Sequence, residues 1–201
     1  MKEKILEKAA DMFLTLGFKN TTMDDLAQEL GISKKTIYTH YRNKTKLVEA
    51  TTEHLFKIIS SGIDEICALE KDPIDEIYDI KKFAMIHLKE GRSSPHHQLR
   101  KYYPGIFNRL KKKQYDIMQT CVLRNIQKGI EQQIYRDNLN IDFVSRIYFS
   151  GVLSIQDREL FPMETFNIED LEHYYLEYHL RGIVTPKGRK KLNAIINSNQ
   201  E

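Results

Sequence analysis

Apolar residues recur at helical spacing along almost the whole chain. In the first segment, Ile5, Ala9, Met12 and Leu16 fall on one helical face. Strict alternation of apolar and polar residues is absent, as are the β-branched runs between turns that indicate strands. The pattern predicts an all-α fold. The expected helices cover residues 2–16, 23–30, 34–41, 44–71, 74–90, 95–102, 105–130, 141–159 and 168–184, and a short basic segment at 186–197 follows.

Several of these helices carry recognisable start and stop signals. Thr22, followed three residues later by Asp25, resembles a capping box, and Gly31 is a natural stop for the same helix. Ser33 is the expected N-cap of the third helix, and Asn43 that of the long fourth helix. The chain therefore contains two very short helices, separated by a turn of only a few residues, before a long one.

The composition narrows the class of protein. Of the 201 residues, 41% are apolar and 29% charged, which favours a folded, soluble chain. We expect a cytoplasmic protein, because no run approaches the length of a membrane span and the N-terminus lacks the apolar core of a secretory signal. Two cysteines exclude a disulfide-rich scaffold and a four-cysteine zinc site.

The composition of the sequence and the length of its predicted helices change along the chain. Beyond Pro73 the predicted helices become longer and richer in Tyr, Met and His. We place the boundary near residue 47, with one domain at 1–46 and a second at 47–201. About 46 residues bury little core by themselves. The first domain is therefore expected to pack against the fourth helix and the rest of the chain.

The two short helices form the most informative part of the sequence. A tight turn containing Gly31 joins them, which is typical of a helix-turn-helix. Leu26, Ala27 and Leu30 form the inner face of the first of the pair. Ile37 completes the small core from the second helix, and the small side chain of Ala27 lets the helices cross closely.

Charge distribution along this segment favours DNA binding. The whole chain carries a net charge of only +3, which says little about partners. Between Leu30 and Val48, however, the charged residues are all basic: Lys34, Lys35, Arg42, Lys44 and Lys46. A locally basic helix suits a phosphate backbone, and neighbouring hydroxyl and imidazole groups can donate to phosphates or base edges.

Here the sequence closely resembles the DNA-binding domain of the TetR family of bacterial transcription regulators. The resemblance covers about residues 4–50. Its matching elements are Gly17-Phe18, Thr21-Thr22, Leu26-Ala27, Leu30-Gly31-Ile32-Ser33, Thr36-Ile37-Tyr38, His40-Tyr41, Asn43-Lys44 and Leu47. It implies an N-terminal three-helix DNA-binding domain with a helix-turn-helix and a larger C-terminal helical domain for effector binding and dimerisation.

The resemblance also implies roles for individual residues, since the third helix of the family lies in the major groove. It assigns base-edge contacts to Lys34, Lys35 and Thr39 and backbone contacts to Tyr38 and His40. Phosphate contacts are implied for Thr22, Lys44, Ser33 and Thr36. Tyr41 is interpreted as core. The alternatives are a solvated helix face for Lys34 and Lys35, a structural role for Tyr38, and pure capping for Thr22 and Ser33.

In the second domain the family layout implies an effector pocket enclosed by the fifth to eighth helices. Candidates are aromatic or polarisable residues expected on inward faces, each with ordinary core packing as the alternative. They are Tyr78, Met85, His87, Tyr102, Met118, Cys121, Tyr148 and Ile155. The identity of the effector is not encoded in this pattern.

The same layout implies that the last two long helices pair with their copies in a homodimer. One helix presents a stripe of Ile147, Gly151 and Ser154, in which small residues allow close approach. The other presents Leu171, Tyr175, Tyr178 and Gly182 at helical spacing. Ordinary packing within one chain is the alternative for both stripes.

Four other features receive structural interpretations. The adjacent His96 and His97 point in different directions on a helix, so a metal site is not expected. Arg109 with residues 111–113 is interpreted as a solvated face, with a second DNA contact as the alternative. Cys67 and Cys121 are interpreted as buried thiols rather than redox sensors. The basic segment at 186–197 is expected to be solvent-exposed.

The function predicted from the sequence is that of a regulator. Phosphate loops, nucleophile elbows and dinucleotide fingerprints are absent, so we expect neither an enzyme nor a cofactor or bound metal. We predict a ligand-responsive repressor that binds a palindromic duplex operator as a homodimer, with an unknown small-molecule effector and no membrane partner. The alternative is a ligand-binding or scaffolding helical protein with a vestigial DNA-binding domain.

Overall fold

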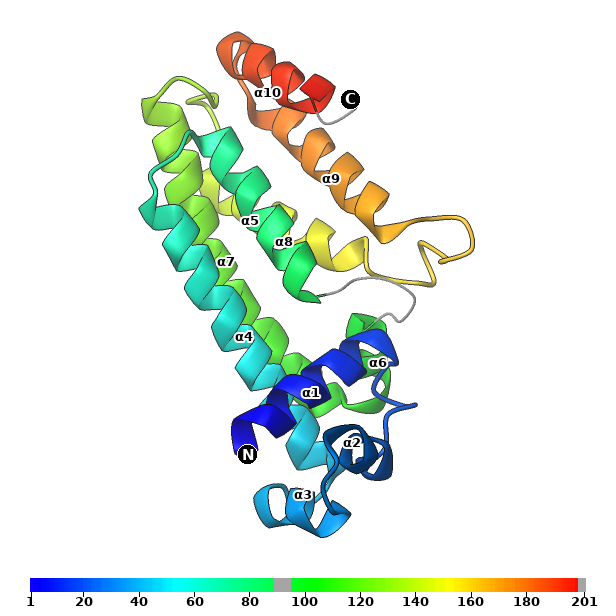
Figure 1. Cartoon of the computed structure of the whole chain (residues 1–201). Helices are drawn as coiled ribbons and strands as arrows, with labels where there is room; N and C mark the ends of the chain where they lie inside the picture. The colour runs from blue at the N-terminus through cyan, green and yellow to red at the C-terminus, as the bar shows by residue number, and fades with distance from the viewer. Residues whose placement is uncertain (89–94, 199–201) are drawn as a thin grey trace. The chain divides into compact units, whose positions relative to one another are not determined.

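The computed structural model describes residues 1–88 and 95–198, and within them the chain is helical (Figure 1). The helices are α1 (Lys2–Thr15), α2 (Met23–Leu30), α3 (Lys34–His40), α4 (Lys44–Ala68), α5 (Pro73–Leu88), α6 (Pro95–Tyr102), α7 (Pro104–Glu131), α8 (Ile141–Ser154), α9 (Ile168–Ile183) and α10 (Pro186–Ser198). In the described residues an isolated antiparallel bridge, Tyr135 with Val184, is the extent of β-pairing. The predicted all-α class is confirmed.

Two predicted helix ends lie several residues beyond the observed ones. The fourth helix ends at Ala68 instead of residue 71, because Glu70 adopts a left-handed φ of 47° that a right-handed helix cannot continue. The predicted helix 141–159 ends at Ser154, and the Asp157 carboxylate then accepts a hydrogen bond from the backbone of Glu159 in a turn. The expected break at 91–94 lies outside the described residues.

The chain divides into two compact units, and the first comprises residues 1–61 and 84–114. Its core draws on α1, α2, α3, the start of α4, α6 and the start of α7: Ile5, Ala9, Met12, Phe13, Phe18, Met23, Leu26, Ala27, Ile37, Tyr41, Leu47, Val48, Leu99 and Ile106. Leu47 and Val48 of α4, together with Leu99 and Ile106 of later helices, complete the core around α1, α2 and α3. The N-terminal helices therefore do pack against the rest of the chain. That prediction is confirmed.

The second unit comprises residues 62–83 and 115–201, as far as they are described. Its main core consists of Ile74, Ile77, Val122, Ile126, Ile134, Tyr135, Tyr148, Leu176, Leu180, Ile183, Val184, Leu192 and Ile196. A buried polar network crosses it: Asn125 donates to the Glu76 carboxylate at 2.8 Å, and Lys128 pairs with that carboxylate at 3.0 Å. This network satisfies a charge that would otherwise be costly to bury.

The basic C-terminal segment is not a free tail. It forms α10, whose Leu192 is fully buried and whose Ile196 also joins the core of the second unit. Lys191 reaches Asp72 at 2.9 Å and Asp75 at 2.8 Å, which fastens the helix to the start of α5. The predicted solvent exposure of 186–197 was therefore wrong for these residues, because the apolar positions of the segment form one buried face.

The boundaries between the two compact units fall inside the long helices α4, α5 and α7. They therefore do not test the functional division at residue 47. That division, with a DNA-binding domain at 1–46 and an effector-binding and dimerisation domain at 47–201, stays a prediction.

Candidate nucleic-acid interface

The helix-turn-helix begins at a complete capping box. Thr22 accepts a hydrogen bond from the Asp25 backbone at 3.1 Å, and the Thr22 backbone donates to the Asp25 carboxylate at 2.8 Å. The Thr22 hydroxyl also donates to this carboxylate at 2.8 Å, and these bonds lower the pKa of Asp25. The sequence signal for this cap is confirmed, and the hydroxyl proton of Thr22 is already engaged within the protein.

The turn between α2 and α3 depends on Gly31. This residue has a left-handed φ of 63°, and its backbone donates to the Gln28 carbonyl at 3.1 Å. The next residue, Ile32, donates back to Ala27 at 3.0 Å. A Cβ at Gly31 would meet open space, so the requirement for glycine lies in the backbone conformation alone.

Helix α3 is fixed by its cap and by one buried residue. Ser33 accepts from the Thr36 backbone at 3.0 Å, and the Thr39 hydroxyl donates to the Thr36 carbonyl at 2.6 Å. Ile37 is fully buried and anchors the helix to the core of the first unit. The rest of the helix is presented to solvent: Lys34, Lys35, Tyr38, Thr39 and His40 are all exposed, and Thr36 is half-buried.

The basic side chains near α3 differ in whether they already contact other groups of the protein. Lys34 forms an ion pair with Asp24 of α2 at 2.7 Å, and this bond raises the pKa of Lys34. Lys44, half-buried at the start of α4, lies 3.5 Å from the Lys19 carbonyl, and desolvation lowers the pKa of its amine. Lys35 is exposed at the N-terminal end of α3.

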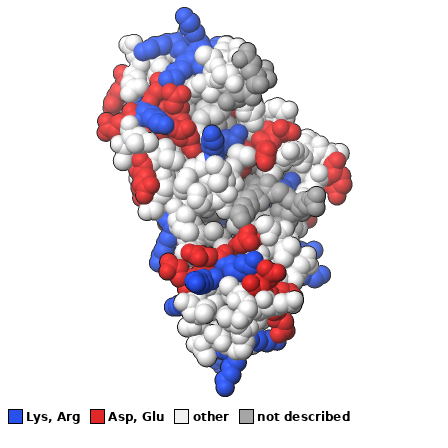
Figure 2. All heavy atoms as spheres, viewed as in Figure 1, with Lys and Arg blue, Asp and Glu red and all other residues white. Residues whose placement is uncertain are grey.

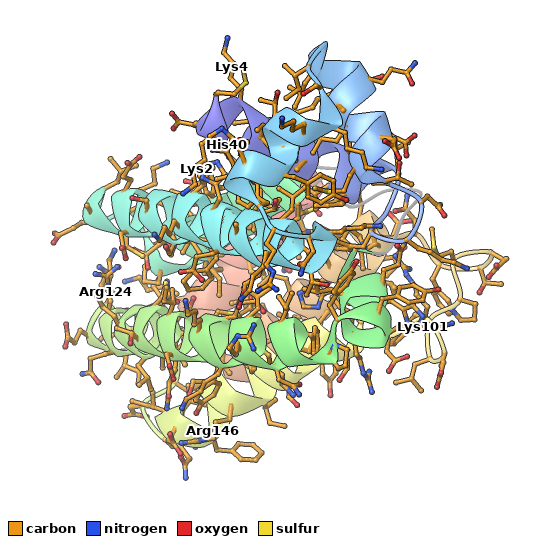
Figure 3. The ribbon with its side chains drawn as sticks, turned by 90° about the horizontal axis from the view of Figure 1, so that it is seen from below. Lys2, Lys4, His40, Lys101, Arg124 and Arg146 are labelled. Atoms are coloured by element: carbon orange, nitrogen blue, oxygen red, sulfur yellow. The ribbon has the colours of Figure 1, made fainter. Side chains whose placement is uncertain are left out.

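Figure 2 shows basic side chains at the extremity of the first unit where α3 lies in Figure 1. Figure 3 adds two lysines that our sequence interpretation left out, since Lys2 and Lys4 on the first turn of α1 lie on the same side of this unit as His40. Both lysines are exposed. The alternating charges at the N-terminus gave no signal for this placement, which results from the packing of α1 against α2.

Two residues near the interface have the structural roles expected of them. Tyr41 is 5% exposed in the core of the first unit, and burial raises the pKa of its phenol. The side chain of Asn43 accepts from the Lys46 backbone at 2.9 Å and thereby caps α4. The N-terminus of α4 is therefore fixed in place beside α3.

The basic cluster on α7 is partly tied down by ion pairs. Arg109 contacts Glu49 at 2.6 Å, and Lys113 contacts Glu53 at 2.6 Å, so the start of α7 is joined to α4 within the first unit. Arg109, Lys111, Lys112 and Lys113 are exposed, in keeping with the solvated face that we predicted. On α6, the His96 ring lies against Phe107, and burial lowers the pKa of His96 to about 4.

The eight pocket candidates fall into different units. Tyr78, Met118, Cys121 and Tyr148 belong to the second unit, and Ile155 lies in a separate small cluster of the same unit with Ile168 and Leu171. Met85, His87 and Tyr102 belong to the first unit. Tyr102 is 41% exposed with two lysine amines near its ring, so the inward orientation expected for it is not observed.

An aromatic cluster surrounds some of these candidates in the second unit. The Tyr148 ring stacks on Tyr175 at 5.9 Å and lies 4.6 Å from His179. Burial raises the pKa of Tyr175 to about 12 and lowers that of His179 to about 4. Tyr78 packs against the same core, and its hydroxyl is buried without a hydrogen-bond partner among the described residues. His179 was missed in the sequence. Its i, i+4 spacing to Tyr175 was the available signal, whereas Tyr148 comes from another helix.

The two stripes expected at a dimer interface are only partly free. A Cβ on Gly151 would collide with the Tyr175 ring, and the Tyr175 hydroxyl donates to the Ile147 carbonyl at 2.9 Å. Leu171 is buried. For Gly151, Leu171 and Tyr175 the alternative of packing within one chain is therefore the observed contact.

The remaining stripe residues are exposed. Ile147 is 48% and Tyr178 77% exposed, Ser154 is exposed, and a Cβ at the exposed Gly182 would meet open space. Two residues that the sequence interpretation missed lie one turn before them on the same helices: Phe143 at 60% and Tyr174 at 64% exposure. Their i, i+4 spacing to Ile147 and Tyr178 was the available signal.

No helix within 1–88 or 95–198 is long and apolar enough to span a membrane. Across those ranges, no three His, Cys, Asp or Glu side chains gather as a metal-ion site.

The family model described as "Bacterial regulatory proteins, tetR family" matches residues 5–51. YvaF, an uncharacterized HTH-type transcriptional regulator of Bacillus subtilis strain 168, is 28% identical over 82% of this chain and 85% of its own. The HTH-type transcriptional repressor KstR2 of Mycolicibacterium smegmatis is 23% identical, over 94% and 93% of the two chains.

Among solved structures, the fold is similar to that of SmeT, the repressor of the Stenotrophomonas maltophilia multidrug efflux pump SmeDEF. The TM-score is 0.67 at 17% identity, and the similarity covers 92% of this chain and 91% of SmeT. The likeness therefore extends well beyond the helix-turn-helix, into the second unit.

Proposed function

We propose that this chain, which belongs to the TetR family of bacterial regulatory proteins and is a DNA-binding transcriptional regulator, represses its targets as a homodimer on a palindromic operator and releases DNA when a small molecule binds. One observation carries the proposal. Helix α3 is anchored by Ile37 and capped by Ser33, while Lys35, Tyr38 and His40 remain exposed. A rigid helix with polar and basic side chains along its free face fits a major groove.

On this proposal the exposed face of α3 divides by chemistry. Lys34 and Lys35 lie at the N-terminal end, where recognition helices meet base edges, and their amines can donate to the acceptors of guanine. The Thr39 hydroxyl, which bonds to its own helix in the free protein, would have to turn toward a base. Tyr38 and His40 then donate to the phosphate backbone, which fixes register but carries no sequence information.

Phosphate contacts are assigned to the helix ends beside α3. The N-terminus of α4 combines the positive end of the helix dipole with Lys44, and Asn43 holds that helix end in place. Thr22 is assigned a phosphate contact at the start of α2, and because its hydroxyl and its backbone N–H both donate to Asp25, one of these bonds must be exchanged for the phosphate. Ser33 and Thr36, bonded to each other at 2.9 Å, stand at the start of α3.

The proposed dimer uses the exposed part of α8 and α9. Phe143 and Ile147 on α8, with Tyr174 and Tyr178 on α9, are large apolar side chains that remain exposed in the single chain. Aromatic residues are enriched at protein interfaces, and a second copy would remove these from water. A symmetric dimer then presents two α3 helices to half-sites about one DNA turn, ~34 Å, apart.

The proposed effector site lies in the second unit, at the aromatic cluster of Tyr78, Tyr148 and His179. Apolar rings with a few polar groups are the usual lining of a small-molecule site, and the unpartnered Tyr78 hydroxyl is available to orient a ligand. The effector would release DNA only to the extent that it binds the DNA-competent and incompetent states unequally.

The test is selection of bound sequences from random duplex DNA by the purified chain, followed by binding at raised salt. We expect enrichment of a palindrome whose affinity falls steeply with salt. Lys35→Ala should lose preference at one position of each half-site, whereas Lys57→Ala, which changes an exposed lysine in the middle of α4, should not. A folded dimer that enriches no sequence at any salt would overturn the proposal and favour a vestigial DNA-binding domain.

A further inference from the structure

The two cysteines of the chain meet inside the second unit. Cys67 lies in the last turn of α4 and Cys121 in α7, 54 residues apart, yet their sulfur atoms are 3.4 Å apart. Both thiols are free in this structure. A disulfide can form only between two sulfur atoms that lie close together, and this pair meets that condition.

The pair lies close to the surface of the unit. Cys67 is 5% exposed and Cys121 is half-buried, while the neighbouring Arg124 is exposed. Figure 3 shows Arg124 on α7 at the side that faces α4. Burial and the neighbouring Cys67 raise the pKa of Cys121, which disfavours the thiolate form of that residue. Cys121 is therefore assigned the second step, in which it attacks an already oxidised partner.

We propose that Cys67 and Cys121 form an oxidant-sensitive dithiol that hydrogen peroxide converts to an intrachain disulfide. The Cys67 thiolate attacks one peroxide oxygen, an S–O bond forms, the O–O bond breaks, and the departing hydroxide takes a proton to leave as water. The Cys121 sulfur then attacks Cys67, the S–S bond forms, and the S–O bond breaks. The second hydroxide leaves as water with the Cys121 proton, so two thiols reduce one peroxide.

The local backbone can accommodate this change. Sulfur atoms at 3.4 Å must approach to about 2.05 Å. Cys67 is the residue before the last residue of α4, and the chain that follows leaves the helix through Glu70 with its positive φ. A shift of the helix end at Cys67 disturbs few backbone hydrogen bonds, while Cys121 stays fixed within α7. Hydrogen peroxide is small enough to reach a buried thiol. Larger reagents that modify thiols are hindered by the same burial.

The experiment treats the full-length reduced protein with hydrogen peroxide and maps its peptides without reduction. We expect one linked pair containing Cys67 and Cys121, a mass loss of two hydrogens, and reversal by dithiothreitol. In Cys121→Ser the sulfenic acid should persist at Cys67 and be trapped by dimedone. Cys67→Ser should give markedly less adduct at Cys121, and circular dichroism checks that both variants fold.

Three results would overturn the inference. One is full alkylation of both thiols after peroxide in folded wild-type protein. Another is linkage only between chains. A third is dimedone adduct on Cys121 in Cys67→Ser that equals or exceeds the adduct on Cys67 in Cys121→Ser, which would remove the assigned order of attack. None of these readouts uses DNA, so failure here leaves the proposed regulatory function intact.

Discussion

Lys34 at the start of α3 is held by Asp24 of α2 through an ion pair of 2.7 Å. The residue expected to reach a base edge is thus partnered within the DNA-free protein. Contact with DNA must replace this partner, and the nearby carboxylate also repels phosphate. Asp24 therefore opposes the interaction that its neighbour is proposed to make.

Asp24→Asn should accordingly tighten DNA binding. Because exposed ion pairs are weak, the gain should be about two- to fivefold at low salt, and it should shrink as salt is added. Fluorescence anisotropy with duplex DNA measures it. Glu29→Gln is the matched control, since it removes the same charge from α2 but frees Lys8, its partner at 2.7 Å. An equal gain in both variants would show a general charge effect and contradict a specific role for Lys34.

Lys44 should make one phosphate contact at the start of α4. Lys44→Ala is expected to weaken binding to all sequences alike and to lower the slope of log affinity against log salt by about one. The comparison variant Lys57→Ala changes an exposed lysine farther along the same helix. If the slope of Lys44→Ala equalled that of wild type, the phosphate assignment would fail even if affinity fell.

Acid should destabilise the second unit through His179. Burial lowers the pKa of this histidine to about 4 from a usual 6.5, so the unfolded chain binds the extra proton between these values. The free energy of unfolding therefore has its full value above about pH 6.5. It decreases as the pH falls toward 4, by about 3 kcal/mol for this one group. His96, with a pKa of about 4, should contribute in the same direction in the first unit.

Urea unfolding at a series of pH values measures this dependence. His179→Phe keeps a ring against Tyr148 but cannot take up a proton, so its unfolding free energy should vary less between pH 6.5 and 4. His40→Gln, which changes an exposed imidazole, serves as the control. An unchanged pH dependence in His179→Phe would show that His179 does not carry this effect.

The proposed dimer should depend on Tyr178, which is 77% exposed in the single chain. Tyr178→Glu places a charge in the expected interface and should raise the dimer dissociation constant by at least tenfold, or about 1.4 kcal/mol. Sedimentation velocity over a dilution series reports it. Leu69→Glu, at a position 63% exposed beyond the end of α4, should leave assembly unchanged. Wild-type protein that sediments as a monomer would contradict the dimer itself.

The sequence alone determined the features whose partners lie within one or two helical turns. The helical period predicted the elements, and the caps at Thr22 and Ser33 and the left-handed turn at Gly31 lie where the sequence placed them. Each rests on bonds between residues three or four apart, so the local sequence contains all the information required. The core position of Tyr41 followed from the resemblance to the family.

Only the tertiary structure decided which distant residues meet. Lys191 contacts Asp75 across 116 positions, and this contact turned an expected free tail into a docked helix. Gly151 was expected to face a second chain but receives the Tyr175 ring of its own, and Cys67 meets Cys121. A helical period states that a residue lies on the inner face but not which helix covers it, because that choice is made by the packing of all the helices together.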